Sequence, residues 1–197
     1  MLWFDNMKNP KPTWYLGNYE IWDVYNRDGN ITGKVKSRDD VFLDGEFHLA
    51  SSLWIINNEG KALIQKRAMT KRINPGMWNI TGGSANTGER SKDACIREVL
   101  EEIGLVVQLA DMTLISRSFG KECIFDDYIV FYDFPLSDLT LQVNEVIDVK
   151  WVTFDEIDQL FYKGQFMFDD IDELKKVRAF VEKERASIKI NKIKAAK

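Results

Sequence analysis

The fold is decided by one stretch of sequence, residues 83–105, which reads GSANTGERSKDACIREVLEEIGL. Its first part is a glycine-containing loop, and its second part has the apolar periodicity of an amphipathic helix. We predict an α-helix over Ser91–Ile103, with Ser91 or Thr87 as its N-terminal cap. Gly104 follows the last turn, where a residue in the left-handed conformation commonly ends a helix.

Three carboxylates of this helix share one face. At about 100° per residue, Glu102 lies about 40° to one side of Glu98, and Glu101 lies about 60° to the other. Like charges at this spacing repel one another, and a divalent cation removes that repulsion. Mg²⁺ prefers oxygen ligands and binds through a few carboxylates together with substrate phosphates, and Mn²⁺ can substitute for it. The opposite, apolar face should pack on a sheet, and it carries Cys95, Ile96, Val99, Leu100 and Ile103.

The loop and one arginine complete the pattern. The loop from Gly83 to Gly88 can approach a metal or phosphate closely, because glycine removes the steric cost. Arg97 is placed to bond Glu101 one turn later and to hold the helix against the loop. A bare R-E-x-x-E-E segment fits an ordinary solvated helix, because Glu and Arg are good helix formers. The longer pattern argues against that reading, because its seven fixed identities arise by chance at roughly one in 10⁸ per start position. These identities are Gly83, Glu89, Arg97, Glu98, Glu101, Glu102 and Gly104.

The pattern G-x5-E-x7-R-E-U-x-E-E-x-G-U, where U is aliphatic, resembles the Nudix signature at every fixed position, and a looser resemblance extends over residues 22–154. The resemblance implies an α/β fold, a three-layer α/β/α sandwich with a mixed sheet. It implies a pyrophosphohydrolase that uses Mg²⁺ and a metal-activated water to cleave a nucleoside diphosphate derivative or another organic diphosphate. It also implies metal ligands, namely Glu98, Glu101, Glu102 and the carbonyl of Gly83. Glu89 either orients these ligands or binds the metal through a water molecule.

The flanking segments resemble the Nudix branch that includes isopentenyl diphosphate isomerase. These segments are residues 22–25, 28–30, 45–49 and 65–67. The isomerase uses a cysteine on the strand before the signature, and the matching residues 78–82 contain none. It also uses several histidines, whereas His48 is the single histidine of this chain, and Cys95 lies on the apolar helix face. The hydrolase is therefore the first hypothesis; a non-catalytic diphosphate-binding or regulatory module and the isomerase are the alternatives.

Charged residues outside the signature supply further candidates. Lys66 and Arg67, with Lys71 and Arg72, are either counter-charges for substrate phosphates or solvated hairpin ends. Glu145 precedes a late strand, and in similar proteins an acidic residue of this loop can act as the general base. Glu101 and Glu102 compete with it for that role.

The remaining candidates have a structural and a functional reading. His48 is either a remnant ligand of metal or phosphate or a hydrogen-bonded structural residue. Trp54 and Trp78 are interpreted as core residues rather than base-stacking residues. The aromatic run over residues 161–168 is interpreted as core or dimer packing, or as a wall of the substrate pocket.

The rest of the chain predicts strands and helices around this site. A turn at residues 26–30 predicts an N-terminal hairpin. We expect strands at 19–25, 31–35, 50–57, 62–67, 76–80, 106–110, 113–119, 124–134 and 146–152, and helices at 154–162 and 171–186. One domain is expected, with a lead-in and hairpin at 1–45, a core at 46–186 and a basic tail at 187–197.

Bulk properties narrow the class of protein. The 197 residues carry a net charge of -4 and a pI near 5.2, which disfavours nucleic acid as a partner. Two cysteines without a CxxC motif make neither a disulfide framework nor a zinc site. No signal peptide or membrane-spanning run is recognised, so a cytoplasmic location is expected. A small-molecule diphosphate is the expected partner, and a homodimer is common in similar proteins.

Overall fold

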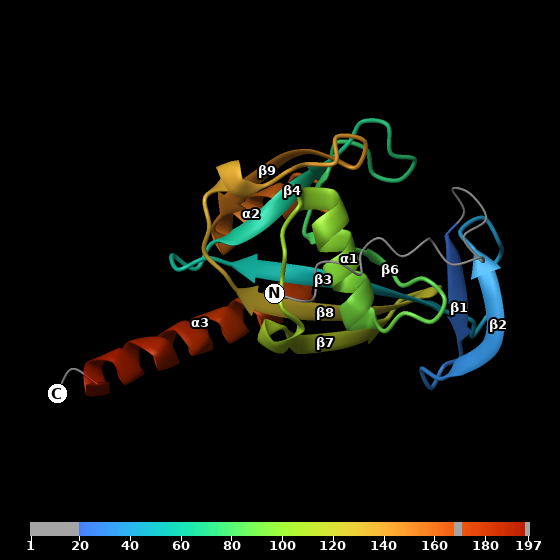
Figure 1. The fold of residues 1–197 in the computed structure, drawn as a ribbon, viewed down its shortest axis with the longest axis horizontal. Helices are drawn as coiled ribbons and strands as arrows, with labels where there is room; N and C mark the ends of the chain where they lie inside the picture. The colour runs from blue at the N-terminus through green and yellow to red at the C-terminus, as the bar shows by residue number, and fades with distance from the viewer. Residues whose placement is uncertain (1–19, 168–170, 196–197) are drawn as a thin grey trace, which may run out of the picture.

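The computed structural model describes residues 20–167 and 171–195, with side chains to residue 186, and is drawn in Figure 1. Its main sheet has seven strands in the order β5-β4-β3-β8-β7, with β6 paired to β3 and β9 paired to β4. The strands β3 and β8 run parallel, and the other pairs are antiparallel. The strands are β1 (Ile21–Tyr25), β2 (Ile31–Ser37), β3 (His48–Ile56), β4 (Ala62–Arg67), β5 (Trp78–Asn79), β6 (Thr81–Ser84), β7 (Thr113–Phe119), β8 (Cys123–Phe131) and β9 (Val146–Val152). The helices are α1 (Ser91–Ile103), α2 (Phe154–Tyr162) and α3 (Ile171–Ala195), with short 3₁₀ turns at Leu109–Asp111 and Leu136–Asp138.

Helices cover both faces of this sheet, so the predicted three-layer sandwich with a mixed sheet is confirmed. Successive side chains of β3 point to opposite faces. Leu53 packs with Val99 of α1 in one buried cluster, and Trp54 packs with Ile157 of α2 and Leu174 of α3 in another. Figure 1 shows that the C-terminal part of α3 extends beyond the sheet.

The predicted N-terminal hairpin is present as the two-stranded sheet β1–β2. Its turn is stabilised by Asn26, whose side-chain oxygen accepts hydrogen bonds from the backbone N–H groups of Asp28 and Asn30. The hairpin is attached to the main domain through backbone hydrogen bonds between Tyr25 and Phe47. The lead-in before residue 20 lies outside the described residues.

Helix α1 spans the predicted residues, but the predicted N-terminal cap is wrong. Arg90 is the capping residue, and its side chain makes no cap hydrogen bond. Ser91 is already helical, and its hydroxyl lies 2.7 Å from the hydroxyl of Tyr128. The Thr87 hydroxyl instead donates to the carbonyl of Ile21. Gly104 ends the helix in the left-handed conformation, as predicted, with φ of 71°.

Two other local predictions are corrected. The sequence predicts a strand over residues 106–110, but residues 106–108 form no regular element and residues 109 and 110 belong to the 3₁₀ turn Leu109–Asp111. The apolar side chains of Leu105 and Val107 pack into the α1 cluster, but the backbone there pairs with no strand of the described chain. Helix α3 runs to Ala195, through most of the tail expected at 187–197, because neither Gly nor Pro interrupts it. Among the described helices, none is both long and apolar enough to cross a membrane.

Candidate active site

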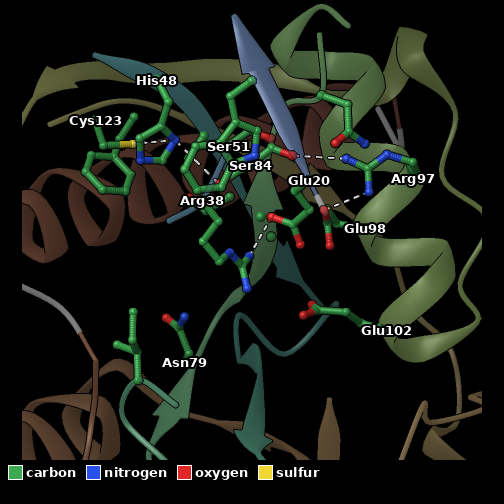
Figure 2. A pocket seen from close by; sticks show the side chains of 18 of the residues that line it. Glu20, Arg38, His48, Ser51, Asn79, Ser84, Arg97, Glu98, Glu102 and Cys123 are labelled. Carbon is green, nitrogen blue, oxygen red and sulfur yellow. Dashed lines mark hydrogen bonds and ion pairs between the residues drawn. The ribbon is translucent and has the colours of Figure 1, made fainter. Parts of the chain in front are cut away.

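One cavity of about 1590 Å³ lies between the N-terminal hairpin, the loop before β5, β6 and α1. Glu98 and Glu102 project into it from α1, and His48 reaches it from β3 (Figure 2). It therefore joins segments that are far apart in the sequence. The predicted site residues on its wall are Gly83, Glu89, Arg97, Glu98, Glu101, Glu102, Glu145 and Arg67. Lys71, Arg72 and His48, also considered above, line it as well.

The three helix carboxylates differ in burial. Glu101 is exposed, Glu98 is half-buried and Glu102 is buried. The carboxylate of Glu102 accepts a 2.7 Å hydrogen bond from the Gln65 side chain, and the Thr81 hydroxyl lies 3.1 Å from it. Burial raises the pKa of Glu102, and these two hydrogen bonds oppose the rise.

Glu98 is the second carboxylate that is held away from water. Burial raises its pKa to about 7; the nearby carboxylates of Glu102 and Glu101 add to this, and Arg97 opposes it. A bound cation would favour the ionised forms of these acids. Among the described residues, no three acidic, imidazole or thiol side chains lie close enough together to hold a metal ion by themselves. Mg²⁺ does not require such a cage, because it keeps several waters and shares its coordination with substrate phosphates.

Glycine makes the close approach between β6 and α1 feasible. A Cβ atom at Gly83 would lie 2.5 Å from the carboxylate carbon of Glu98, so any side chain there would displace Glu98. At Gly82, φ is 153°, and a Cβ atom would lie 2.2 Å from the carbonyl oxygen of Ser51. The two glycines therefore allow the backbone at the start of the loop to lie against Glu98 and against strand β3, as predicted for the loop.

Arg97 connects the helix to the loop, as predicted. It donates to both carboxylate oxygens of Glu89, at 2.8 and 3.0 Å, and to the carbonyl of Ser84 at 3.0 Å. It also pairs with Glu98 at 2.7 Å and with Glu101 at 3.2 Å. Arg97 therefore orients several acids at once, and Glu89 is engaged in this network from the loop side.

Three of the four basic residues before the signature face the cavity and one does not. Arg67, Lys71 and Arg72 line the cavity, whereas Lys66 does not. Alternation along β4 explains this, because Gln65 points to Glu102 and the next side chain, Lys66, points away. The ammonium of Lys66 lies 5.7 Å from the ring centre of Trp78. The prediction of a substrate contact by Lys66 therefore disagrees with its position.

Glu145 lies on the cavity wall in the loop before β9, where its carboxylate forms an ion pair with Lys71. The nearby Arg72 pairs with Asp39 of the segment after β2, at 2.9 Å. Two of the four basic residues are thus already paired with acids at the cavity rim.

His48 has a structural environment although it lines the cavity. Its ring stacks on Trp22 with centroids 4.2 Å apart, and its Nδ1 lies 3.5 Å from Ser84 Oγ and 3.8 Å from Cys123 Sγ (Figure 2). Burial lowers the pKa of His48 to about 4, so the ring is neutral near pH 7. These contacts fit the hydrogen-bonded structural reading of His48.

The aromatic predictions are mostly confirmed as core packing. Trp54 is fully buried and stacks on Phe154, and Trp78 packs against the same cluster. In the run 161–168, Phe161 and Phe166 also pack there, while Tyr162 is exposed and Met167 lines the cavity. Residue 168 lies outside the described residues.

Several cavity residues were not singled out in the sequence. Phe42, Ser52, Phe125 and Asp127 line the cavity beyond the signature. One available signal was the Asp126-Asp127 pair, because two adjacent carboxylates inside an otherwise apolar strand are unusual unless they have partners.

Comparisons with known proteins agree with this geometry. The family model described as the NUDIX domain matches residues 46–171. An uncharacterised Nudix hydrolase of Listeria monocytogenes is 41% identical over 150 residues, which cover 75% of this chain and 88% of that protein. An isopentenyl-diphosphate Delta-isomerase of Salmonella arizonae is 32% identical over 123 residues, covering 58% of this chain and 66% of the isomerase.

The fold has solved counterparts as well. The crystal structure of DR0079 from Deinococcus radiodurans superposes with a TM-score of 0.67 and 19% identity, covering 79% of this chain and 96% of that one. The signature, the sandwich and the sequence matches lead to one conclusion. This chain belongs to the Nudix family of hydrolases.

Proposed function

We propose that the protein hydrolyses a phosphoanhydride bond of a nucleoside diphosphate derivative or of another organic diphosphate, with Mg²⁺ held by Glu98, Glu101, Glu102 and the carbonyl of Gly83. The observation that best supports this proposal is that Glu98 lies against Gly83 in a cavity that Glu102 also lines. Both acids have raised pKa values because burial disfavours their charge. Acids in that state are suited to binding a cation together with an anionic substrate.

Each residue contributes a separate task. Mg²⁺, when bound, polarises a phosphoryl oxygen and makes a bound water more acidic. Glu98 and Glu102 hold their carboxylates from a rigid helix, and the hydrogen bond from Gln65 orients Glu102. Arg97 orients Glu98 and Glu89 through its five-donor guanidinium. Arg67 and Lys71, which line the same cavity, supply positive charge for the substrate phosphates.

Glu145 is our candidate for the group that accepts the proton of the attacking water. It lines the same cavity as the helix acids but comes from a different element, the loop before β9. Its carboxylate forms an ion pair with the ammonium of Lys71 at the cavity rim. The exposed Glu101 is the competing acceptor.

The test is release of phosphate or nucleoside monophosphate from a panel of nucleoside triphosphates, dinucleotides, nucleotide sugars and isoprenoid or thiamine diphosphates, with and without Mg²⁺. Glu98→Gln, Glu101→Gln and Glu102→Gln should each lower kcat by about 100-fold or more, because each removes a charge from the site. Glu182→Gln, on the exposed side of α3, is the matched control. Near-normal turnover in both Glu101→Gln and Glu102→Gln would show that the site is assigned wrongly.

The isomerase alternative is tested in the same panel with isopentenyl diphosphate. The described structure argues against isomerase chemistry, because burial raises the thiol pKa of both cysteines. Cys95 is fully buried on the apolar side of α1, and burial raises its pKa to about 12. Cys123 is also buried, which raises its thiol pKa as well. Metal binding without turnover of any diphosphate would favour the regulatory module.

A further inference from the structure

The N-terminal ends of β3 and β8 together form a floor of the cavity. This floor lies on the face of the sheet that α2 and α3 cover nearer the middle of the two strands. Parallel pairing places three residue pairs side by side, His48 with Cys123, Ala50 with Phe125 and Ser52 with Asp127. All six line the cavity. The next pair on this face, Trp54 with Ile129, lies instead in the buried cluster under α2 and α3. We call the six outer residues the β3–β8 floor.

The floor adjoins the glutamate site through strand β6. Strand β6 pairs with β3 so that Gly82 lies opposite Ser52 and Gly83 lies opposite Ser51. Cross-strand partners share a face, so Gly82 belongs to the floor side, while Gly83 faces Glu98. One cavity is lined by both groups of residues. A molecule with its diphosphate at Glu98 can therefore place its other end on the floor.

Asp127 is the chemically distinctive residue of the floor. It is 6% exposed, and its carboxylate accepts hydrogen bonds from the hydroxyl of Ser52 and, at 2.9 Å, from that of Ser116. Its neighbour Asp126 is paired with Arg117, whereas no cationic side chain pairs with Asp127 within residues 20–167 and 171–186. A carboxylate offers about four lone-pair positions, so Asp127 can accept further hydrogen bonds from a ligand.

Phe125 supplies a flat apolar surface beside this acceptor. It lies two residues before Asp127 on the same face of β8, which separates the two Cα atoms by about 7 Å. Its ring is accessible, with 39% of the residue exposed, and its cross-strand neighbour is the small Ala50. Aromatic rings of this kind stack on nucleobases. A carboxylate at the edge of a stacked base accepts from an exocyclic amine, and repels a carbonyl oxygen at the same position.

We propose that the β3–β8 floor binds the nucleobase of the substrate and, through Phe125 and Asp127, selects a base with its amine at purine position 6 or pyrimidine position 4, namely adenine or cytosine. This inference rests on the proposed hydrolysis at the glutamate site and names the substrate class for it. The phosphates lie toward Glu98, and the amine of the base donates to Asp127. Hypoxanthine and uracil, which carry an oxygen where adenine and cytosine carry the amine, are disfavoured.

The experiment compares nucleoside diphosphate sugars that differ only in the base, adenine against hypoxanthine and cytosine against uracil. The wild-type protein should prefer the amine by roughly 10- to 100-fold in kcat/KM, the value of one hydrogen bond to a charged group. Asp127→Asn offers a donor as well as an acceptor, so it should abolish or reverse this preference. Asp111→Asn, in the exposed 3₁₀ turn outside the cavity, is the matched control and should keep it. The purine and pyrimidine pairs together show which ring size the floor takes.

Two further measurements separate the outcomes. Calorimetric binding of AMP against IMP, and of CMP against UMP, in EDTA reports on the base without any hydrolysis. Phe125→Leu should weaken all base-bearing substrates about tenfold and leave isopentenyl diphosphate unaffected, and it decides the question if Asp127→Asn does not fold. Hydrolysis or binding that ignores the amine, or keeps the same preference in Asp127→Asn, overturns the inference. Absence of hydrolysis with an Asp127-dependent amine preference in binding refutes the proposed function and supports the floor.

Discussion

Replacing Glu98 by glutamine should stabilise the metal-free protein at mildly alkaline pH while it abolishes Mg²⁺-dependent turnover. Burial, reinforced by the charges of Glu102 and Glu101, raises the pKa of Glu98 from 4.5 to about 7 although Arg97 opposes the rise. Each pKa unit corresponds to about 1.36 kcal/mol, so ionised Glu98 costs at most about 3 kcal/mol of unfolding free energy near pH 8. Glutamine has nearly the same shape and no charge, so the variant avoids this cost.

The two shifted pKa values determine whether the free energy of unfolding rises or falls with pH. Because the folded-state pKa of Glu98 lies above its unfolded value, the folded protein holds an extra proton between about pH 4.5 and 7, and the free energy of unfolding falls as pH rises through this window. His48 acts in the opposite direction. Burial lowers its pKa from 6.5 to about 4, so its contribution grows as pH rises through that interval. Subtracting the wild-type curve from the Glu98→Gln curve cancels His48 and leaves Glu98.

The assay is urea unfolding followed by circular dichroism in EDTA, from about pH 4.5 to about pH 8. The stability difference between Glu98→Gln and wild type should be small at the acid end and reach about 2 to 3 kcal/mol at the alkaline end. Saturating Mg²⁺ should then stabilise wild type more than the variant, because the variant lacks one of the proposed carboxylate ligands. The exposed control Glu182→Gln should give a flat difference. A variant that is less stable than wild type, or a difference that does not change with pH, would refute the reasoning.

Other substitutions test the rest of the site. Gly83→Ala places a methyl group 2.5 Å from the Glu98 carboxylate carbon, so Mg²⁺ affinity measured by calorimetry should fall about tenfold or more with the fold retained; unchanged affinity would contradict the close packing. Arg97→Lys keeps the charge but loses the bidentate bond to Glu89, so kcat should fall about 10- to 100-fold with no loss of helix content; full activity would assign Arg97 a purely structural role. Glu145→Gln should lower kcat about 100-fold or more and leave KM nearly unchanged, and a normal kcat would transfer the role of proton acceptor to Glu101.

Much of the local structure was predictable because it depends on short-range periodicity. The helix over Ser91–Ile103 and the strands β4, β7 and β9 match their predicted bounds, since the apolar period of an amphipathic helix differs from that of a half-buried strand. The prediction at 106–110 was wrong because a strand also needs a neighbouring backbone to pair with, and the described chain offers none there. The cap of α1 was wrong because the Ser91 hydroxyl bonds Tyr128, 37 positions away.

The candidate site was likewise predictable only where its contacts join residues close together in the sequence. Arg97 bonds Glu101 one helical turn later, as its spacing requires. The exclusion of Lys66 from the cavity depends instead on which side of β4 faces α1, and hence on the contact between Gln65 and Glu102. The pairing of Lys71 with Glu145 joins two loops 74 residues apart, and no spacing rule reaches that far.

The sequence by itself determined the family, the helix and the face that carries three carboxylates, because positions along a helix follow from its 3.6-residue repeat. Only the tertiary structure decided that Glu102 is buried, Glu98 half-buried and Glu101 exposed, since burial depends on the strands that pack against the helix. It also decided that β8 lies parallel to β3, which places Asp127 beside Ser52 although 75 positions separate them. Pairing between distant strands is set by the packing of the whole sheet, so the residues that we propose to select the substrate became visible only in the fold.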